Sequence, residues 1–176
     1  MRTHPVQAIG APDITSTRWR IDPTRSRVEF HVKTFLGLAT VKGSFSSYHG
    51  KLDLGATPAV ELIVEGDSLE TKNFKRDEHL RSPDFFGVEA HPYVRFVSET
   101  SVLDGERLTV QGQLHARGAS MPLSLEATLR RIGEELEIEA VTEADHRELG
   151  MTYNKLGMVG TPSTLMVSGR LVRDEN

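Results

Sequence analysis

The amino-acid sequence predicts an all-β fold, in which about eight or nine strands form one antiparallel sheet that closes into a barrel. Apolar and polar residues alternate along most of the chain, as they do in strands with one buried face. Short turns such as "LDGER" and "RIGEE" join several of these segments as hairpins. A sheet this long has edges that favour aggregation, and closure into a barrel removes them. The length of 176 residues suits a single domain.

The first part of the chain is expected to consist of an arm followed by the first strands. Residues 1–17 are polar, contain two prolines and show no periodicity. We therefore expect a flexible N-terminal arm over residues 1–17 and a barrel domain over residues 18–174. The segments "RVEFHVKT", "TVKGSFSS" and "AVELIVEG" place on one face Val28, Phe30, Val32, Val41, Phe45, Val60, Leu62 and Val64.

The second half of the chain repeats the alternation in longer segments. These are "YVRFVSET", "RLTVQGQLHARG", "PLSLEATLRRI", "ELEIEAVTEA" and "STLMVSGRLVR". Their apolar faces include Phe96, Leu108, Val110, Leu114, Leu123, Leu125, Leu136, Ile138, Leu165 and Val167. The interior of an eight-stranded barrel is either packed with side chains or holds one small ligand. Alternation alone leaves both possibilities open.

The stretch "ETKNFKRDEHLRSPDFF", from Glu70 to Phe86, is where the strand pattern stops. Asn73 can cap a helix from Phe74 to Arg81, and Pro83 ends it because the residue before proline avoids helical geometry. Strands cannot close the end of a barrel, since their side chains point inward or outward rather than across the opening. We therefore expect a short helix near one end of the barrel.

This helix is expected to present an apolar underside to the barrel and a polar outer face. The underside is assigned to Phe74, Leu80, Phe85 and Phe86, and the outer face to Lys75, Asp77, Glu78 and Arg81. Asp77 and Arg81 have the spacing of a helical ion pair. Arg76 and His79, three residues apart, have two interpretations. They tether the helix to the barrel, or they bind a polar or anionic head group of a ligand.

Composition excludes several classes of protein and site. Without cysteine, the chain has no disulfide, no thiolate catalyst and no cysteine-ligated zinc. A net charge of −4 argues against a nucleic-acid-binding protein, which needs a basic face. No apolar run has the length of a signal-peptide core or of a membrane span, so we expect a cytoplasmic protein without a transmembrane segment.

Metal and hydrolase chemistry receive little support from the sequence. The seven histidines are His4, His31, His49, His79, His91, His115 and His146, and no two of them have the spacing of a local ligand pair. We therefore expect no metal site and no cofactor. The G-x-S-x-G motif of a nucleophilic serine is absent. A triad assembled from distant residues stays open, because such triads are recognised by geometry.

Four stretches of the sequence together resemble the YceI-like family of bacterial proteins. They are "WRIDPTRSRVEFHVK", "ATVKGSFSSYHGKLDL", "ETKNFKRDEHLRSPDFFGVEAHPYVRFVS" and "LHARGASMPLSLEA", and the resemblance extends from residue 19 to about residue 173. It implies a lipocalin-like, eight-stranded antiparallel barrel with an internal apolar cavity. Near the C-terminus, where the family tends to have an asparagine–arginine pair, "FG" and a tryptophan–asparagine, this chain has Asp145, His146, Leu149 and Tyr153.

The resemblance also implies a function and a ligand. Members of the family bind polyisoprenoids or other lipids, and many are periplasmic. We expect this chain to carry or sequester a long-chain apolar lipid, a polyisoprenoid or isoprenoid quinone, and not to be an enzyme. Its ligand-binding residues are expected to be Phe30, Val32, Phe45, Phe74, Arg76, His79, Phe85, Phe86, Phe96, Val110, Leu125 and Ile138. The alternatives are a lipid-modifying isomerase or hydrolase with the same cavity, and a structural protein with a filled barrel. A homodimer is possible.

Overall fold

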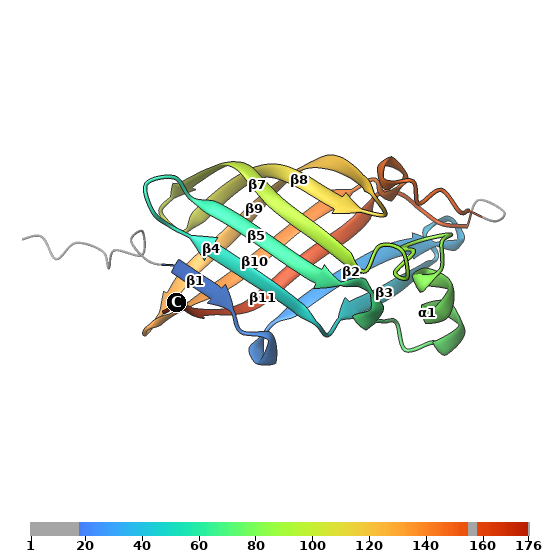
Figure 1. The fold of residues 1–176 in the computed structure, drawn as a ribbon, viewed down its shortest axis with the longest axis horizontal. Coiled ribbons are helices and arrows are strands. Elements are labelled where there is room, and N and C mark those ends of the chain that lie inside the picture. Colours follow the sequence, from blue (N-terminus) through green and yellow to red (C-terminus); the bar gives the residue numbers. More distant parts are fainter. Residues whose placement is uncertain (1–17, 155–157, 176) are drawn as a thin grey trace, which may run out of the picture.

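The structure is a computed structural model that describes residues 18–154 and 158–175. The predicted N-terminal arm lies outside these residues. Eight strands form a closed antiparallel barrel, because β1 pairs with both β4 and β11, and the predicted fold class is thus confirmed (Figure 1). In order around the barrel they are β1 (Arg18–Ile21), β4 (Tyr48–Asp53), β5 (Ala59–Glu65), β7 (Tyr93–Asp104), β8 (Arg107–Ala116), β9 (Ala119–Ile132), β10 (Glu135–Ala144) and β11 (Ser163–Arg173).

Three further strands extend the sheet at one end of the barrel. They are β2 (Arg27–Thr34), β3 (Ala39–Phe45) and β6 (Leu69–Glu70), joined to the barrel through the pairing of β2 with β11. Residues 164–168 of β11 pair with β2, and residues 171–173 pair with β1. As a result, the β2–β3 hairpin lies at the same end of the barrel as the only α-helix of the described ranges (Figure 1).

Gly169 marks the point where β11 changes partner. Its φ of +146° is open to glycine, and a Cβ there would lie 2.4 Å from the Cα of Ser26. The backbone N–H of Arg170 donates to Ser26 Oγ at 3.1 Å. The close approach of Ser26 is therefore possible because position 169 has no side chain.

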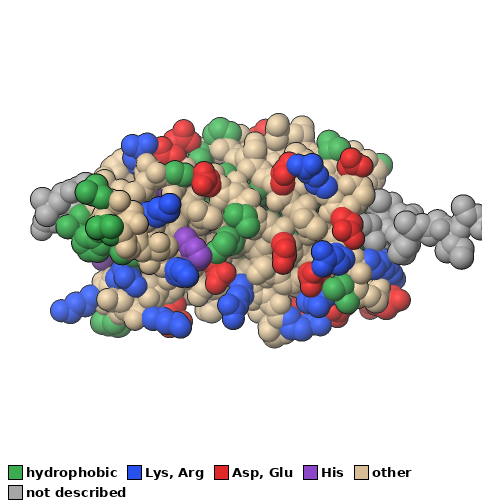
Figure 2. Space-filling view, turned by 180° about the vertical axis from the view of Figure 1, so that it is seen from behind, with side chains coloured by type: hydrophobic (Ala, Val, Ile, Leu, Met, Phe, Trp, Pro, Cys, Tyr) green, Lys and Arg blue, Asp and Glu red, His purple; other side chains and the backbone are tan. Residues whose placement is uncertain are grey.

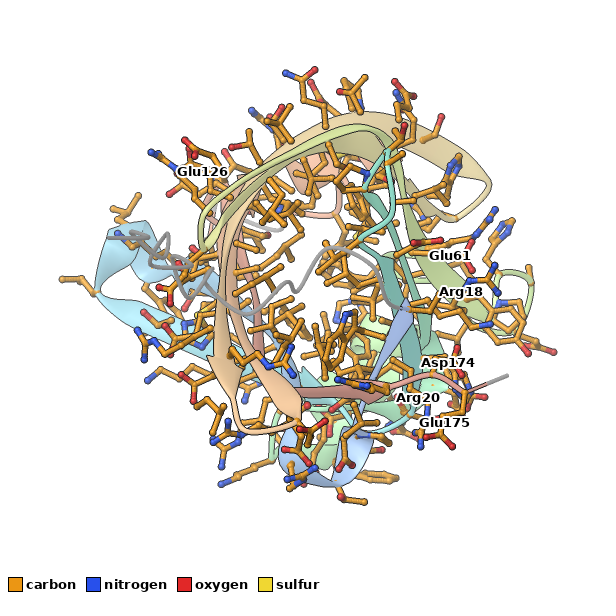
Figure 3. All side chains as sticks on the ribbon, turned by 90° about the vertical axis from the view of Figure 1, so that its left-hand side faces the viewer. Arg18, Arg20, Glu61, Glu126, Asp174 and Glu175 are labelled. Carbon is orange, nitrogen blue, oxygen red and sulfur yellow. The ribbon has the colours of Figure 1, made fainter. Side chains whose placement is uncertain are left out.

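Alternation along the strands separates the barrel interior from its surface. On β8, Leu108 and Val110 are fully buried, while Thr109 between them is exposed. Figure 3 looks down the barrel axis and shows Glu61 and Glu126 on the outer wall. Salt bridges join these carboxylates to arginines of adjacent strands, Arg95 at 2.6 Å and Arg107 at 2.7 Å.

Helix α1 (Phe74–Arg81) has the predicted bounds, because local signals determine both of its ends. Asn73 Oδ1 accepts a hydrogen bond from the backbone N–H of Arg76 at 3.0 Å, which is the expected N-cap. Ser82 follows the last turn, and Pro83 prevents its continuation. Within the described ranges, no helix is long and apolar enough to cross a membrane.

Two details of the predicted helix are wrong. The Asp77–Arg81 ion pair does not form, because Asp77 is buried and accepts hydrogen bonds from Thr71 N (2.9 Å) and Thr71 Oγ1 (2.5 Å). Arg81 instead donates to the backbone oxygen of Leu69 at 2.8 Å. Phe74, expected on the underside, is 75% exposed. The reason is tertiary: the face that carries Asp77 turns toward the segment before the helix, and the first helical residue turns outward.

Candidate functional site

The barrel interior contains two apolar cavities. The outer cavity, of about 400 Å³, lies at the α1 end, and the inner cavity, of about 170 Å³, lies further along the barrel. Four residues line both and mark where the cavities meet: Phe45, Val94, Leu114 and Leu165. Tyr153 and Met158 line the outer cavity and are 37% and 39% exposed, so this cavity reaches the molecular surface.

The structure distributes the predicted site residues between these two cavities. The outer cavity is lined by Phe30, Val32, Phe45, Arg76, His79, Phe85 and Phe86. The inner cavity is lined by Phe45, Phe96, Val110, Leu125 and Ile138. Phe74 lines neither, since it is exposed on the outside of α1. The ligand-binding role of the residues that line a cavity stays a prediction, whereas the position of Phe74 gives it no contact with either cavity.

Three phenylalanine rings pack together in the wall of the outer cavity. The ring centroids lie 5.5 Å apart for Phe30 and Phe45, 6.1 Å for Phe30 and Phe86, and 5.8 Å for Phe45 and Phe86. Such distances and tilted orientations suit attractive aromatic pairs. Phe30 lies over Gly43, its partner on β3, where a Cβ would be only 2.2 Å from the Phe30 Cζ. The cluster thus ties the turn after α1 to β2 and β3.

A second aromatic cluster lies at the mouth of the outer cavity. His79 makes edge contacts with Phe85 and Tyr153, at centroid distances of 5.1 Å and 4.6 Å. His79 Nε2 also lies 2.9 Å from Asp84 Oδ2. This cluster joins α1 to the segment that follows the 3-10 helix η4 (His146–Leu149), so the mouth is framed by two parts of the chain distant in sequence.

Arg76 tethers the helix to the segment before it. Its Nε donates to Thr71 Oγ1 at 2.7 Å and its Nη2 to the Thr71 backbone oxygen at 2.8 Å. Thr71 in turn donates to the buried Asp77. These bonds hold the helix to the segment that follows β6 rather than to a strand of the closed barrel, so Arg76 has a structural role that is more local than the predicted tether. Because Arg76 also lines the outer cavity and a guanidinium has five N–H donors, a head-group role stays a prediction.

A histidine–serine pair in the outer cavity was not predicted from the sequence. His146 Nδ1 lies 2.8 Å from Ser163 Oγ, and Ser163 is 6% exposed. Burial lowers the pKa of His146 from its ordinary value, against the weaker opposing effect of Asp145, which favours the neutral imidazole. In either neutral tautomer, the pair retains one N–H or O–H donor beyond the bond between them. The pair is thus a polar, uncharged group in an apolar cavity.

Sequence reasoning missed most of the outer cavity's C-terminal wall. These residues are Ala144, His146, Leu149, Met151, Tyr153, Met158, Val159 and Ser163. The one signal was the resemblance of the loop "ADHRELGMTYN" to the corresponding family segment. Regarding metals, the described part of the chain contains no group of three or more His, Asp or Glu side chains that could hold an ion.

Comparisons with known proteins agree with this architecture. The model of the YceI-like domain matches residues 19–171. The UPF0312 protein PC1_2518 of Pectobacterium carotovorum is 31% identical over 112 residues, and Protein YceI of Escherichia coli O157:H7 is 30% identical over the same length. Both matches cover 61% of this chain and 58% of the relative.

Solved structures show the same fold at low sequence identity. BcnA of Burkholderia cenocepacia superimposes with a TM-score of 0.79 at 14% identity, covering 86% of this chain and 99% of that one. A domain from Saccharophagus degradans, described as polyisoprenoid binding, superimposes with a TM-score of 0.72 at 12% identity, covering 90% of this chain and 100% of that one. The family model spans nearly all of the described barrel, and the chain therefore belongs to the YceI-like family.

Proposed function

We propose that the protein binds a long-chain apolar lipid, a polyisoprenoid or an isoprenoid quinone, inside the barrel, and carries or sequesters it. The observation that carries this proposal is the pair of apolar cavities that meet at Phe45, Val94, Leu114 and Leu165. Two apolar spaces that share lining residues can hold a flexible chain that extends from one into the other. The description of the Saccharophagus degradans domain as polyisoprenoid binding supports the same ligand class.

The physical driving force is removal of hydrocarbon from water. Each buried CH₂ group contributes about 0.8 kcal/mol. Summed over a long isoprenoid, this would exceed any measured affinity, because ordering and desolvation costs limit the net binding free energy. The lipid is therefore expected to bind tightly enough to remain with the protein during purification.

The distribution of polar groups supports one orientation of the lipid. The inner cavity is lined almost wholly by apolar side-chain surface, whereas the outer cavity includes Arg76, His79 and the His146–Ser163 pair. A buried polar group needs a hydrogen-bond partner. We therefore propose that the tail occupies the inner cavity and that a polar head lies in the outer one.

A lipid-modifying enzyme is the second candidate, and one observation favours it. The hydrogen-bonding distance between His146 Nδ1 and Ser163 Oγ places a base beside a hydroxyl inside the cavity. Such a pair can activate a serine nucleophile. This candidate predicts that a bound lipid is chemically altered and that Ser163→Ala abolishes turnover.

Mass spectrometry of an organic extract of the purified protein tests the proposal. The expected result is an apolar chain lipid recovered unchanged from wild type and from Ser163→Ala. An extract without lipid, together with no uptake of added geranylgeraniol, would refute the carrier. A product formed by wild type and absent with Ser163→Ala would replace the carrier with the enzyme.

A further inference from the structure

The β2–β3 hairpin ends in a group of exposed apolar side chains, here called the apolar tip and defined as residues 35–38. Phe35 is 53% exposed, Leu36 94% and Leu38 90%. Figure 2 shows hydrophobic side chains gathered at this end of the molecule, on the left in that view, with Lys and Arg side chains around them. Grouped exposed apolar residues are typical of a surface that meets a protein or a membrane.

The backbone holds the apolar tip in place although its side chains face solvent. Phe35 and Leu36 have φ values of +51° and +58°, which residues other than glycine adopt at a cost. The N–H of Phe35 donates to the Met158 oxygen at 3.0 Å, and the N–H of Gly160 donates to the Lys33 oxygen at 2.7 Å. A fixed tip loses little conformational freedom on docking, which favours binding.

The surroundings of the apolar tip are basic. Lys33 and Lys42 flank it on β2 and β3, are exposed, and form no ion pair within the residues that the structure describes. From Phe30 to Leu52 the sequence has no Asp or Glu, although the whole chain has a net charge of −4. The charge near the tip thus complements an anionic surface.

A similar arrangement recurs on α1 at the same end of the barrel (Figure 1). Phe74 is 75% exposed and lies between the exposed Lys72 and Lys75. Apolar side chains beside lysines are the combination that binds the interface of an anionic bilayer. Two elements therefore present the same chemistry around the barrel end.

The hairpin that carries the apolar tip also forms part of the cavity mouth. Val32, Thr34 and Val41 line the outer cavity, and Thr34 pairs with Val159 in an isolated bridge. A tip immersed in lipid would bring the open end of the outer cavity against the bilayer. Exchange of an apolar chain would then avoid passage through water.

We propose that the apolar tip docks on the surface of an anionic phospholipid bilayer and that lipid moves between this bilayer and the outer cavity. Docking rests on the tip and its lysines alone, whereas the exchange step rests on the proposed carrier function.

A second copy of the chain fits the apolar tip less well than a bilayer does. A two-fold contact between tips would bring Lys33 and Lys42 near the same lysines of the other copy, and like charges repel.

Co-sedimentation with vesicles of phosphatidylcholine mixed with phosphatidylglycerol tests docking. The variant is Leu36→Asn with Leu38→Ser, since asparagine tolerates the positive φ of position 36. The matched control is Val102→Ser, which removes a 65% exposed side chain near the C-terminal end of β7. The outer cavity is lined instead by Val94, near the N-terminal end of that strand. We expect the double variant to bind vesicles about tenfold more weakly for each leucine removed, and the control to bind like wild type.

Two further measurements separate docking from the carrier function. Wild-type binding should weaken with added salt and on vesicles of phosphatidylcholine alone, because lysines contribute to it. Geranylgeraniol uptake in the absence of vesicles should be the same in wild type and the double variant, because Leu36 and Leu38 line neither cavity.

Several results would overturn the proposal. Equal vesicle binding by wild type and the double variant would overturn docking. Failure of wild type to bind vesicles, while it still takes up geranylgeraniol, would also overturn docking but would leave the proposed carrier function intact. Vesicle binding without any lipid uptake would retain docking and remove exchange. A concentration-dependent dimer in light scattering, lost in the double variant and accompanied by no vesicle binding, would assign the apolar tip to self-association instead.

Discussion

Replacing Phe86 with alanine should loosen the α1 end of the barrel and weaken lipid binding, whereas the same replacement of Phe74 should do neither. Phe86 lines the outer cavity, and its ring lies 6.1 Å from that of Phe30 and 5.8 Å from that of Phe45. Phe74 belongs to the same end of the molecule but is 75% exposed. The two variants thus remove identical atoms from a packed site and from an exposed one.

The expected magnitude follows from the contacts of Phe86. Each aromatic pair contributes about 0.5–1.5 kcal/mol beyond its buried area, so two pairs contribute about 1–3 kcal/mol. Removing the ring also loses the free energy gained by transferring its carbons out of water, and this loss is smaller than in the core because the ring is only half buried. The two contributions together lower the unfolding free energy by about 2–4 kcal/mol. At Phe74 the change should stay within about 0.5 kcal/mol.

Urea denaturation followed by circular dichroism measures these free energies, and calorimetric titration with geranylgeraniol measures binding. The dissociation constant should rise about tenfold for each 1.4 kcal/mol that Phe86 contributes to holding the cavity wall in place. Should Phe86→Ala fail to fold, Phe86→Leu provides the same comparison with less loss of volume. Equal changes for the two positions, or wild-type affinity in folded Phe86→Ala, would refute the assigned role of the cluster.

Four further predictions concern Gly43, His146, Arg76 and the expected lack of a metal. Gly43→Val should push the Phe30 ring into the outer cavity, because a side chain at position 43 would overlap this ring. In the same assays, the unfolding free energy should fall by about 1–3 kcal/mol and geranylgeraniol uptake should decrease. Unchanged uptake would contradict this prediction. Because the pKa of His146 is lowered in the folded state, the unfolded state binds more protons than the folded state once the pH falls below the ordinary value of 6.5. The melting temperature in thermal scans should therefore decrease as the pH is lowered below 6.5. This decrease should be shallower for His146→Gln. Arg76→Ala should destabilise the protein by about 1.5–3 kcal/mol, because its hydrogen bonds to Thr71 are lost. It should also weaken binding of an anionic lipid more than binding of a neutral lipid with the same tail. Equal losses of affinity for the two lipids would show that Arg76 has only the structural role. EDTA should leave the melting temperature unchanged, and a decrease reversed by zinc would contradict the expected lack of a metal.

Local patterns were enough to predict the barrel and its helix. Alternation assigned Val110 and Leu125 to the inner face of their strands because side chains in a strand point to opposite faces in turn. The bounds of α1 depend on Asn73 and Pro83, which act on their immediate neighbours. Whether the barrel was filled or hollow could not be derived in this way, and that prediction came from the family resemblance.

Contacts between distant segments were decided by the tertiary structure. Asp77 faces Thr71 rather than Arg81 because the chain before α1 packs against the helix, which no helical spacing reveals. His146 meets Ser163 because β10 and β11 pair in a register that aligns Ala144 with Ser163, and the chain turns back just beyond it. A register depends on turns and packing along the whole sheet. The sequence by itself therefore determined which residues face inward, whereas the pairing of strands decided which of them meet around the cavity.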